Sequence, residues 1–240
     1  MKKIPAPKLD FNTYVARPET HWIEREPFDS FTSIYGSGYL PYSGTKGLQN
    51  IFYSARSARV ALNDFELTSE NRRIAKKFDG QFIKQRIPLK EFRITPEFID
   101  FFVSYFMQRH GPCVMPRERL ELILSCGLVS TVVTYAKDSR PIGYVLEVED
   151  ADMAHYWYSA YDLSLIRQSL GLWLMGDCVS DAKERGLAHY YLGTVYGEKA
   201  LYKTNFEPLE WWDGKGWNSD IKILKEISAK VSTAREITTI

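Results

Sequence analysis

The chain has 240 residues, of which 45% are hydrophobic and 14% aromatic, and its formal net charge is +1. That length suffices for one well-packed domain and a smaller N-terminal module. No apolar run approaches the roughly 20 residues that a membrane-spanning helix needs, and no apolar stretch follows the lysines at the N-terminus. We therefore expect a cytoplasmic protein without a signal peptide or a membrane partner.

The three cysteines, Cys113, Cys126 and Cys178, are widely spaced and form no C-x-x-C pair. This spacing predicts neither a zinc site nor a disulfide framework. Charge is uneven, because residues 56–93 hold ten basic and five acidic side chains, a net charge of +5. Such a segment either binds phosphates or forms a solvated helix face. Nothing in it indicates a DNA partner.

The first half of the chain carries few regular patterns. Residues 1–50 are rich in Pro, Gly, Ser and Tyr, which predicts an irregular segment. Short alternating stretches within 51–66 indicate a strand, and Thr68 or Ser69 can cap a basic helix that runs to Phe78. Thr95-Pro96-Glu97 is a helix start, with a capping residue, a proline and an acid in order.

The second half is more regular. The expected elements are a short helix over 117–126, strands over 129–136, 142–148 and 153–161, a helix over 165–185, a strand over 188–194, a short helix over 198–204, and a strand and turn over 207–217, followed by a surface helix from about 220. Three consecutive strands with short turns predict an antiparallel meander.

This order resembles the N-acetyltransferase-like (GNAT) fold. The expected class is α+β, with a mixed, mostly antiparallel, splayed sheet flanked by helices over residues 81–240 and a small irregular module over 1–80. In that fold an acyl donor sits where the fourth and fifth strands part, and the loop entering the long helix holds its phosphates. Here the loop contains Gln168, Ser169, Leu170 and Gly171, a partial match because Trp173 stands where the pattern has a small residue.

Four further pieces, in order, resemble the arginyl-tRNA–protein transferases and their bacterial leucyl-transferring relatives. They are Tyr156–Asp162, Ser169–Gly171, Tyr190–Gly193 and Tyr202–Pro208, with a weaker match over Phe65–Arg73. The chain departs from the family in having no cysteine over 53–60, where the family carries pairs that can hold a metal or cluster. Leu163 also replaces a family proline after Asp162.

The resemblance implies an aminoacyltransferase, arginyl- or leucyl-transferring, that moves an amino acid from charged tRNA to the N-terminal α-amine of a peptide or protein beginning with an acidic residue. This is the chemistry of N-degron formation. The ester is already activated, so the enzyme positions the reactants, helps to deprotonate the amine and stabilises an oxyanion. No metal and no cofactor is expected, and the partners are charged tRNA and the acceptor.

The candidate catalytic residues are Asp162, Tyr191 and His155. Asp162 either orients the amine, takes its proton or pairs with a basic aminoacyl side chain, or it caps a helix. His155 is either a general base or an ordinary strand residue, and Tyr191 either donates to the oxyanion or packs in the core. Lys203 either meets a phosphate or carboxylate of the substrate or is a solvated surface side chain. Arg72 and Arg73 either bind tRNA phosphates or the acceptor's carboxylate, or they form an exposed helix face.

Two other functions remain open. The partial loop from Gln168 to Gly171 is compatible with a coenzyme-A-dependent N-acyltransferase that uses acetyl-CoA. The missing cysteines and the short N-terminal module are compatible with a non-catalytic module that binds tRNA or protein N-termini.

Overall fold

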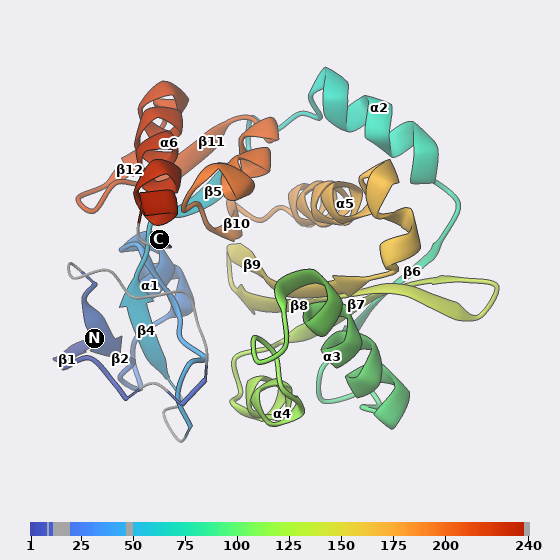
Figure 1. Cartoon of the computed structure of the whole chain (residues 1–240), viewed down its shortest axis with the longest axis horizontal. Helices are drawn as coiled ribbons and strands as arrows, with labels where there is room; N and C mark the ends of the chain where they lie inside the picture. Colours follow the sequence, from blue (N-terminus) through green and yellow to red (C-terminus); the bar gives the residue numbers. More distant parts are fainter. Residues whose placement is uncertain (9, 12–19, 47–49, 238–240) are drawn as a thin grey trace.

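The computed structural model describes residues 1–8, 10, 11, 20–46 and 50–237. Its centre is an eight-stranded sheet with the strand order β12-β11-β5-β10-β9-β8-β7-β6 (Figure 1). The strands are β5 (Ser57–Ala61), β6 (Ile83–Pro88), β7 (Thr131–Lys137), β8 (Arg140–Asp150), β9 (Met153–Tyr161), β10 (His189–Thr194), β11 (Leu209–Trp212) and β12 (Trp217–Asn218). The helices around it are α2 (Ser69–Phe78), α3 (Pro96–His110), α4 (Arg117–Ser125), α5 (Leu170–Glu184) and α6 (Ile221–Ile237), with 3₁₀ helices η1 (Leu163–Gln168) and η2 (Glu198–Asn205).

The predicted meander is confirmed, because β7, β8 and β9 pair in antiparallel order, and β6 extends it at the edge beside β7. β10 then joins β9 in parallel, but only from the pair His189–Met153 to the pair Tyr191–His155. Beyond that pair the two strands separate, and β10 bulges between Tyr191 and Gly193 where it pairs with β5. Gly193 has a φ of +83°, which an L side chain adopts only with strain. The glycine thus allows the turn that opens the sheet, as the GNAT fold requires.

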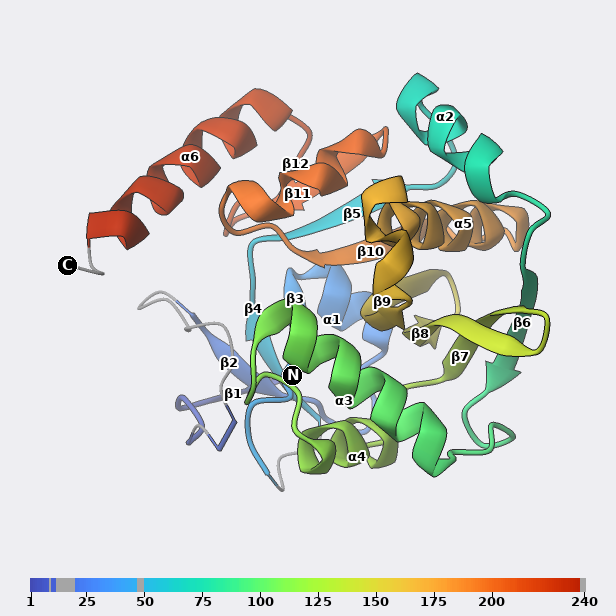
Figure 2. The ribbon, with the colours of Figure 1, turned by 45° about the vertical axis from the view of Figure 1, so that its right-hand side comes forward.

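Helices cover both faces of this sheet (Figures 1 and 2). On one face, α5 and α2 enclose a core that includes Leu174, Val179 and Tyr190. On the other face, α3 and α4 pack with Phe102 and Leu120 over the β7–β9 part of the sheet. Burial of these apolar side chains is the main stabilising contribution to the fold.

The N-terminal module is more regular than predicted. A second, antiparallel sheet in the order β1-β2-β4-β3 consists of β1 (Lys2–Ile4), β2 (Trp22–Glu24), β3 (Tyr39–Pro41) and β4 (Ile51–Ser54), and α1 (Phe31–Gly36) packs on it. The expectation of an irregular segment is therefore wrong for the described parts of residues 1–50. α1 and β4 place Tyr35 and Phe52 in one cluster with Val148, Met153 and Tyr191 of the larger sheet.

The two sheets divide between β4 and β5. β5 lies inside the larger sheet, and α2 packs on α5. The predicted division at residue 80 thus does not coincide with the division between the sheets.

Two further expectations need correction. The helix expected over 165–185 is interrupted, because Ser169 has a φ of +69° and separates η1 from α5. β6 was not expected from the sequence. It is an edge strand with polar and half-exposed residues, including an Ile83 side chain that is 66% exposed, so it lacks the apolar alternation of a core strand.

Helix starts were predicted correctly where a side chain caps them. Thr68 accepts a hydrogen bond from the Asn71 amide at the start of α2, and Thr95 accepts one from the Phe98 amide at the start of α3. Both caps stand before the first apolar residue of a helical pattern, which is why the sequence reveals them.

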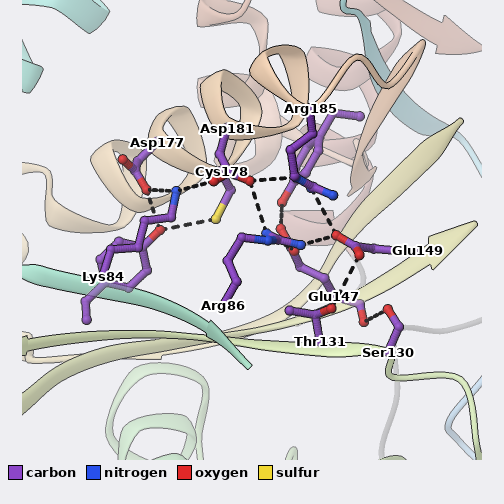
Figure 3. Close-up of polar contacts among 12 residues, drawn as sticks. Lys84, Arg86, Ser130, Thr131, Glu147, Glu149, Asp177, Cys178, Asp181 and Arg185 are labelled. Carbon is purple, nitrogen blue, oxygen red and sulfur yellow. Dashed lines mark hydrogen bonds and ion pairs between the residues drawn. The ribbon is translucent and has the colours of Figure 1, made fainter. Parts of the chain in front are cut away.

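A charged network joins the sheet to α5 (Figure 3). Its ionic members are Lys84, Arg86, Arg185, Glu147, Glu149, Asp177 and Asp181. Glu147 lies at its centre, fully buried, and accepts hydrogen bonds from Arg86 at 2.7 Å and from the Tyr190 hydroxyl. Burial raises the pKa of Glu147, and the Arg86 guanidinium opposes that shift. Each buried carboxylate is thereby compensated, which an interior of low dielectric constant requires.

Candidate functional site

The site is built where β9 and β10 part. His155 is in the last paired position of β9, Gly193 lies just past the last paired position of β10, and η2 brings Lys203 back to the same place. A Cβ on Gly193 would stand 3.5 Å from Lys203 Nζ and 3.6 Å from His155 Nε2. The two nitrogens therefore converge on one point of the splay.

Lys203 is buried, with 8% of its surface exposed, and its Nζ donates a hydrogen bond to the Thr194 carbonyl at 2.8 Å. Within the part of the chain that the structure describes, it forms no ion pair. Burial lowers the pKa of Lys203 to about 7, so a large share of this side chain is an uncharged amine at neutral pH. The alternative of a solvated surface lysine is wrong.

His155 is also buried, and its Nδ1 lies 2.9 Å from the Tyr35 hydroxyl of α1. Burial, with a smaller effect of the nearby Lys203 charge, lowers the pKa of His155 to about 3. The ring is therefore neutral at physiological pH and is a weak base there. The N-terminal module thus contributes directly to the site through Tyr35.

Tyr191 lies opposite His155 in the pairing of β9 with β10, but its hydroxyl is bound elsewhere, and Asp162 follows the far end of β9. The Tyr191 ring packs 4.9 Å from the Tyr35 ring, but its hydroxyl accepts a hydrogen bond from Arg59 at 3.2 Å. Asp162 caps η1 by accepting from the Ser164 amide at 2.9 Å, and it pairs with Arg140 at 3.1 Å. The capping alternative therefore describes the geometry of Asp162.

The loop from Gln168 to Gly171 lies at the start of α5. Gln168 is exposed and Ser169 is half-buried, whereas Leu170 is fully buried in the core. A Cβ on Gly171 would lie 2.6 Å from the Tyr161 hydroxyl oxygen and 2.7 Å from the ring carbon that carries it. Gly171 therefore permits close packing of the β9 tyrosine on the first turn of α5.

The basic segment is divided between the surface and the interior. Arg72 and Arg73 are exposed on α2, and Arg73 donates two hydrogen bonds of 2.7 Å to Glu70. Lys84 and Arg86, by contrast, face carboxylates in the charged network. The net charge of residues 56–93 thus overstates the positive charge available to a phosphate.

Among the described residues, no group of three or more His, Cys, Asp or Glu side chains is arranged to hold a metal ion. Over the same residues, no helix is both long and apolar enough to cross a membrane.

Sequence reasoning identified His155 and Lys203 but missed Tyr35 and the role of Gly193. Gly193 stands in the family-like piece Tyr190–Gly193, and a glycine inside a strand pattern signals a bulge. Tyr35 lies in a segment without periodicity, so no local signal marks it.

A family model described as an acetyltransferase (GNAT) domain matches residues 90–204, from the loop after β6 through Lys203. An aspartate/glutamate leucyltransferase of Hyphomonas neptunium is 25% identical over 196 residues, which cover 74% of this chain and 76% of the relative. Another, from Rhizobium leguminosarum bv. trifolii, is 28% identical over 247 residues and covers 89% of this chain and 92% of the relative.

Among solved structures, a crystal structure of FemX superposes with a TM-score of 0.43 at 10% identity, covering 68% of this chain and 59% of that one. The family match shows that the chain has a GNAT fold, and the chain is similar over most of its length to bacterial aspartate/glutamate leucyltransferases.

Proposed function

We propose that this protein transfers leucine from charged tRNA to the N-terminal α-amine of peptides or proteins that begin with aspartate or glutamate. The observation that carries the proposal is the similarity to aspartate/glutamate leucyltransferases, which spans both the N-terminal module and the larger sheet. The relatives' names favour leucine over arginine as the transferred residue. Transfer from tRNA also fits a cytoplasmic protein.

The convergence of Lys203 and His155 at the splay supports a group-transfer reaction. In a GNAT fold the acyl donor enters between the parting strands, and here these strands present an amine and an imidazole. Aminolysis of an ester needs an uncharged attacking amine and stabilisation of the developing oxyanion. It needs no covalent intermediate, and we propose that aminoacyl-tRNA is the donor without a resident cofactor.

We place tRNA contacts on α2, where Arg72 and Arg73 are exposed to solvent. Arg73 already pairs with Glu70 at the surface, an arrangement that a phosphate can replace at little cost because exposed pairs contribute little. The loop residues Gln168 and Ser169 remain the proposed contacts to the donor end at the splay.

The competing function is acetyl transfer from acetyl-CoA, which the description of the matching family model favours. Against it, Tyr161 packs on Gly171 at the turn where a coenzyme pyrophosphate would need access to backbone amides. A binding module without chemistry is the third possibility.

One experiment separates the three. The protein is mixed with a fully charged tRNA pool and short peptides that begin with Asp, Glu or Ala, with acetyl-CoA in a parallel reaction, and peptide masses are read. The added mass of leucine on the acidic-start peptides alone supports the proposal. An added acetyl group supports the coenzyme A function, and unchanged peptides in both reactions would leave only a binding role.

A further inference from the structure

Lys203 has an environment unlike that of a structural lysine. It is buried beside β9 and β10, and the one hydrogen bond described for its Nζ goes to a backbone carbonyl, that of Thr194. A structural lysine in such a place normally faces a carboxylate, because an unpaired buried charge is costly. Here the cost is avoided when the amine is uncharged, the state in which it can accept a proton.

We propose that Lys203 accepts the proton from the attacking amine, and that the Tyr35–His155 pair positions Lys203 and sets its charge. This inference rests on the proposed function and names the proton acceptor in it. Lys203 and His155 converge on the same point of the splay, within 3.6 Å of the position of a Cβ on Gly193. The missing side chain of Gly193 leaves space beside this glycine that both nitrogens border, and a reacting amine would lie there.

The reaction then balances as follows. The acceptor α-amine, uncharged, attacks the carbonyl carbon of the aminoacyl ester, and a C–N bond forms. One proton of the attacking nitrogen passes to Lys203 Nζ. The bond between the carbonyl carbon and the ribose oxygen breaks, and Nζ returns the proton to that oxygen. An amine with a pKa of about 7 is suited to both steps, because it gains and loses the proton with similar ease.

The Tyr35 hydroxyl fixes which nitrogen of His155 carries hydrogen. Burial raises the pKa of Tyr35 well above its usual value, so the hydroxyl keeps its proton. Among the described residues, His155 Nδ1 is the one acceptor recorded for that proton, at 2.9 Å. A buried hydroxyl normally donates to such a partner, so the neutral ring carries its hydrogen on Nε2.

The Nε2–H group faces the point shared with Lys203. A donor in this position disfavours the ammonium form of Lys203 and can donate to the uncharged amine or to the oxyanion. The other groups that face Lys203 are the Tyr202 ring on η2 itself, 5.9 Å from Nζ, and the backbone of Gly193 and Thr194 on β10. No carboxylate of the described chain pairs with it.

The first test measures kcat at saturating peptide between about pH 5.5 and 9, so that the acceptor's own amine is less able to determine the profile. We expect the wild-type rate to rise with pH to a plateau, with a midpoint near 7. Lys203→Arg keeps the charge but removes the base, and should lower the plateau by about 100-fold or more and abolish that midpoint. Lys199→Met, an exposed lysine of the same 3₁₀ helix, should keep the wild-type profile.

Tyr35→Phe gives a second, milder test. Without the hydroxyl, the His155 hydrogen can move to Nδ1, and Nε2 can accept a hydrogen bond from the Lys203 ammonium. The kcat midpoint should then rise by about one unit, so that activity lost at pH 7 returns at pH 9. A merely structural role of Tyr35 would lower activity equally at every pH, and that result would overturn the assigned role of the pair.

A third measurement does not depend on activity. The ¹³Cε resonances of lysines in the wild-type protein should contain one that titrates near pH 7 and is missing in Lys203→Arg. A Lys203 midpoint at the ordinary value of about 10.4 would overturn the inference, as would an unchanged kcat profile in Lys203→Arg. If the wild type transfers leucine but its rate has no midpoint near 7, only the role of Lys203 fails. If it transfers no amino acid at all, the proposed function fails as well.

Discussion

Removal of the Arg86 guanidinium is the most direct test of the charged network beneath α5. Glu147 is fully buried, and Arg86 at 2.7 Å is the cation that contacts it, whereas Glu149 and Asp181 also pair with Arg185. Arg86→Met should therefore leave one uncompensated buried carboxylate. Breaking a buried pair in this way costs about 3–5 kcal/mol.

For a domain of this size, 1 kcal/mol corresponds to roughly 2–4 °C in Tm, so a fall of about 6–20 °C is expected. Thermal and urea unfolding, followed by circular dichroism, would measure it. Arg73→Met is a matched control, because its pair with Glu70 is 58% and 46% exposed. That control should lose less than about 1 kcal/mol.

The stability loss of Arg86→Met should depend on pH through the protonation of Glu147. Burial raises the folded-state pKa of Glu147, and the loss of Arg86 raises it further. The folded variant then holds this proton more tightly than the unfolded chain does. The stability of the variant relative to wild type should therefore be highest at low pH. It should fall as the pH rises above the pKa of Glu147 in the unfolded chain, about 4.3, towards its pKa in the folded variant. A deficit below about 1 kcal/mol at pH 8, or one that is equal at pH 4 and pH 8, would refute this reasoning. Arg86→Met combined with Glu147→Gln should recover part of the loss.

Three other substitutions test the splay and its surroundings. Gly193→Ala should cost about 1–2 kcal/mol in urea unfolding, because φ is +83°, and should lower kcat, because the methyl group would occupy the space that Lys203 and His155 border. Gly171→Ala should cost about 1–3 kcal/mol, because the new methyl group would overlap the Tyr161 ring, and the same substitution should cost less when it is made in a Tyr161→Ala background. Arg72→Ala with Arg73→Ala should weaken leucyl-tRNA binding and reduce the slope of log K against log salt by about two. An unchanged slope in a filter-binding titration would remove α2 from the tRNA surface.

The elements that could be predicted from the sequence are those with a local physical signal. The start of α3 at Thr95-Pro96 and the meander of β7, β8 and β9 follow from capping and from runs of apolar residues between short turns. The strands of the N-terminal sheet have three or four residues each, which is too short for a period to show. Ser169 likewise interrupts a helical pattern because its φ is positive. Hydrophobic periodicity does not report on backbone angles, so this break could not be predicted.

The sequence could single out Lys203 as a candidate, but it could not reveal the environment of this side chain. Lys203 lies in a short polar segment that has the composition of a solvated turn, and only the fold of η2 against β10 buries it. An exposed lysine is a cation that can bind phosphates. Burial lowers the pKa of Lys203 to about 7, so that a large share of this amine is uncharged near neutral pH. A pKa shift of this kind arises from contacts between distant segments, so sequence spacing carries no information about it.

One residue of the site comes from the N-terminal module, outside the region that matches the GNAT domain. The family match begins at residue 90, whereas the hydroxyl that holds His155 comes from Tyr35, 120 positions before it in the chain. Tyr35 is fully buried between Phe52 and Tyr191, so its position depends on the packing of the small sheet against the larger one. A change that loosens this contact should therefore alter the charge of Lys203 without touching the splay itself. In this arrangement the module acts on the reaction through the tautomer of one histidine.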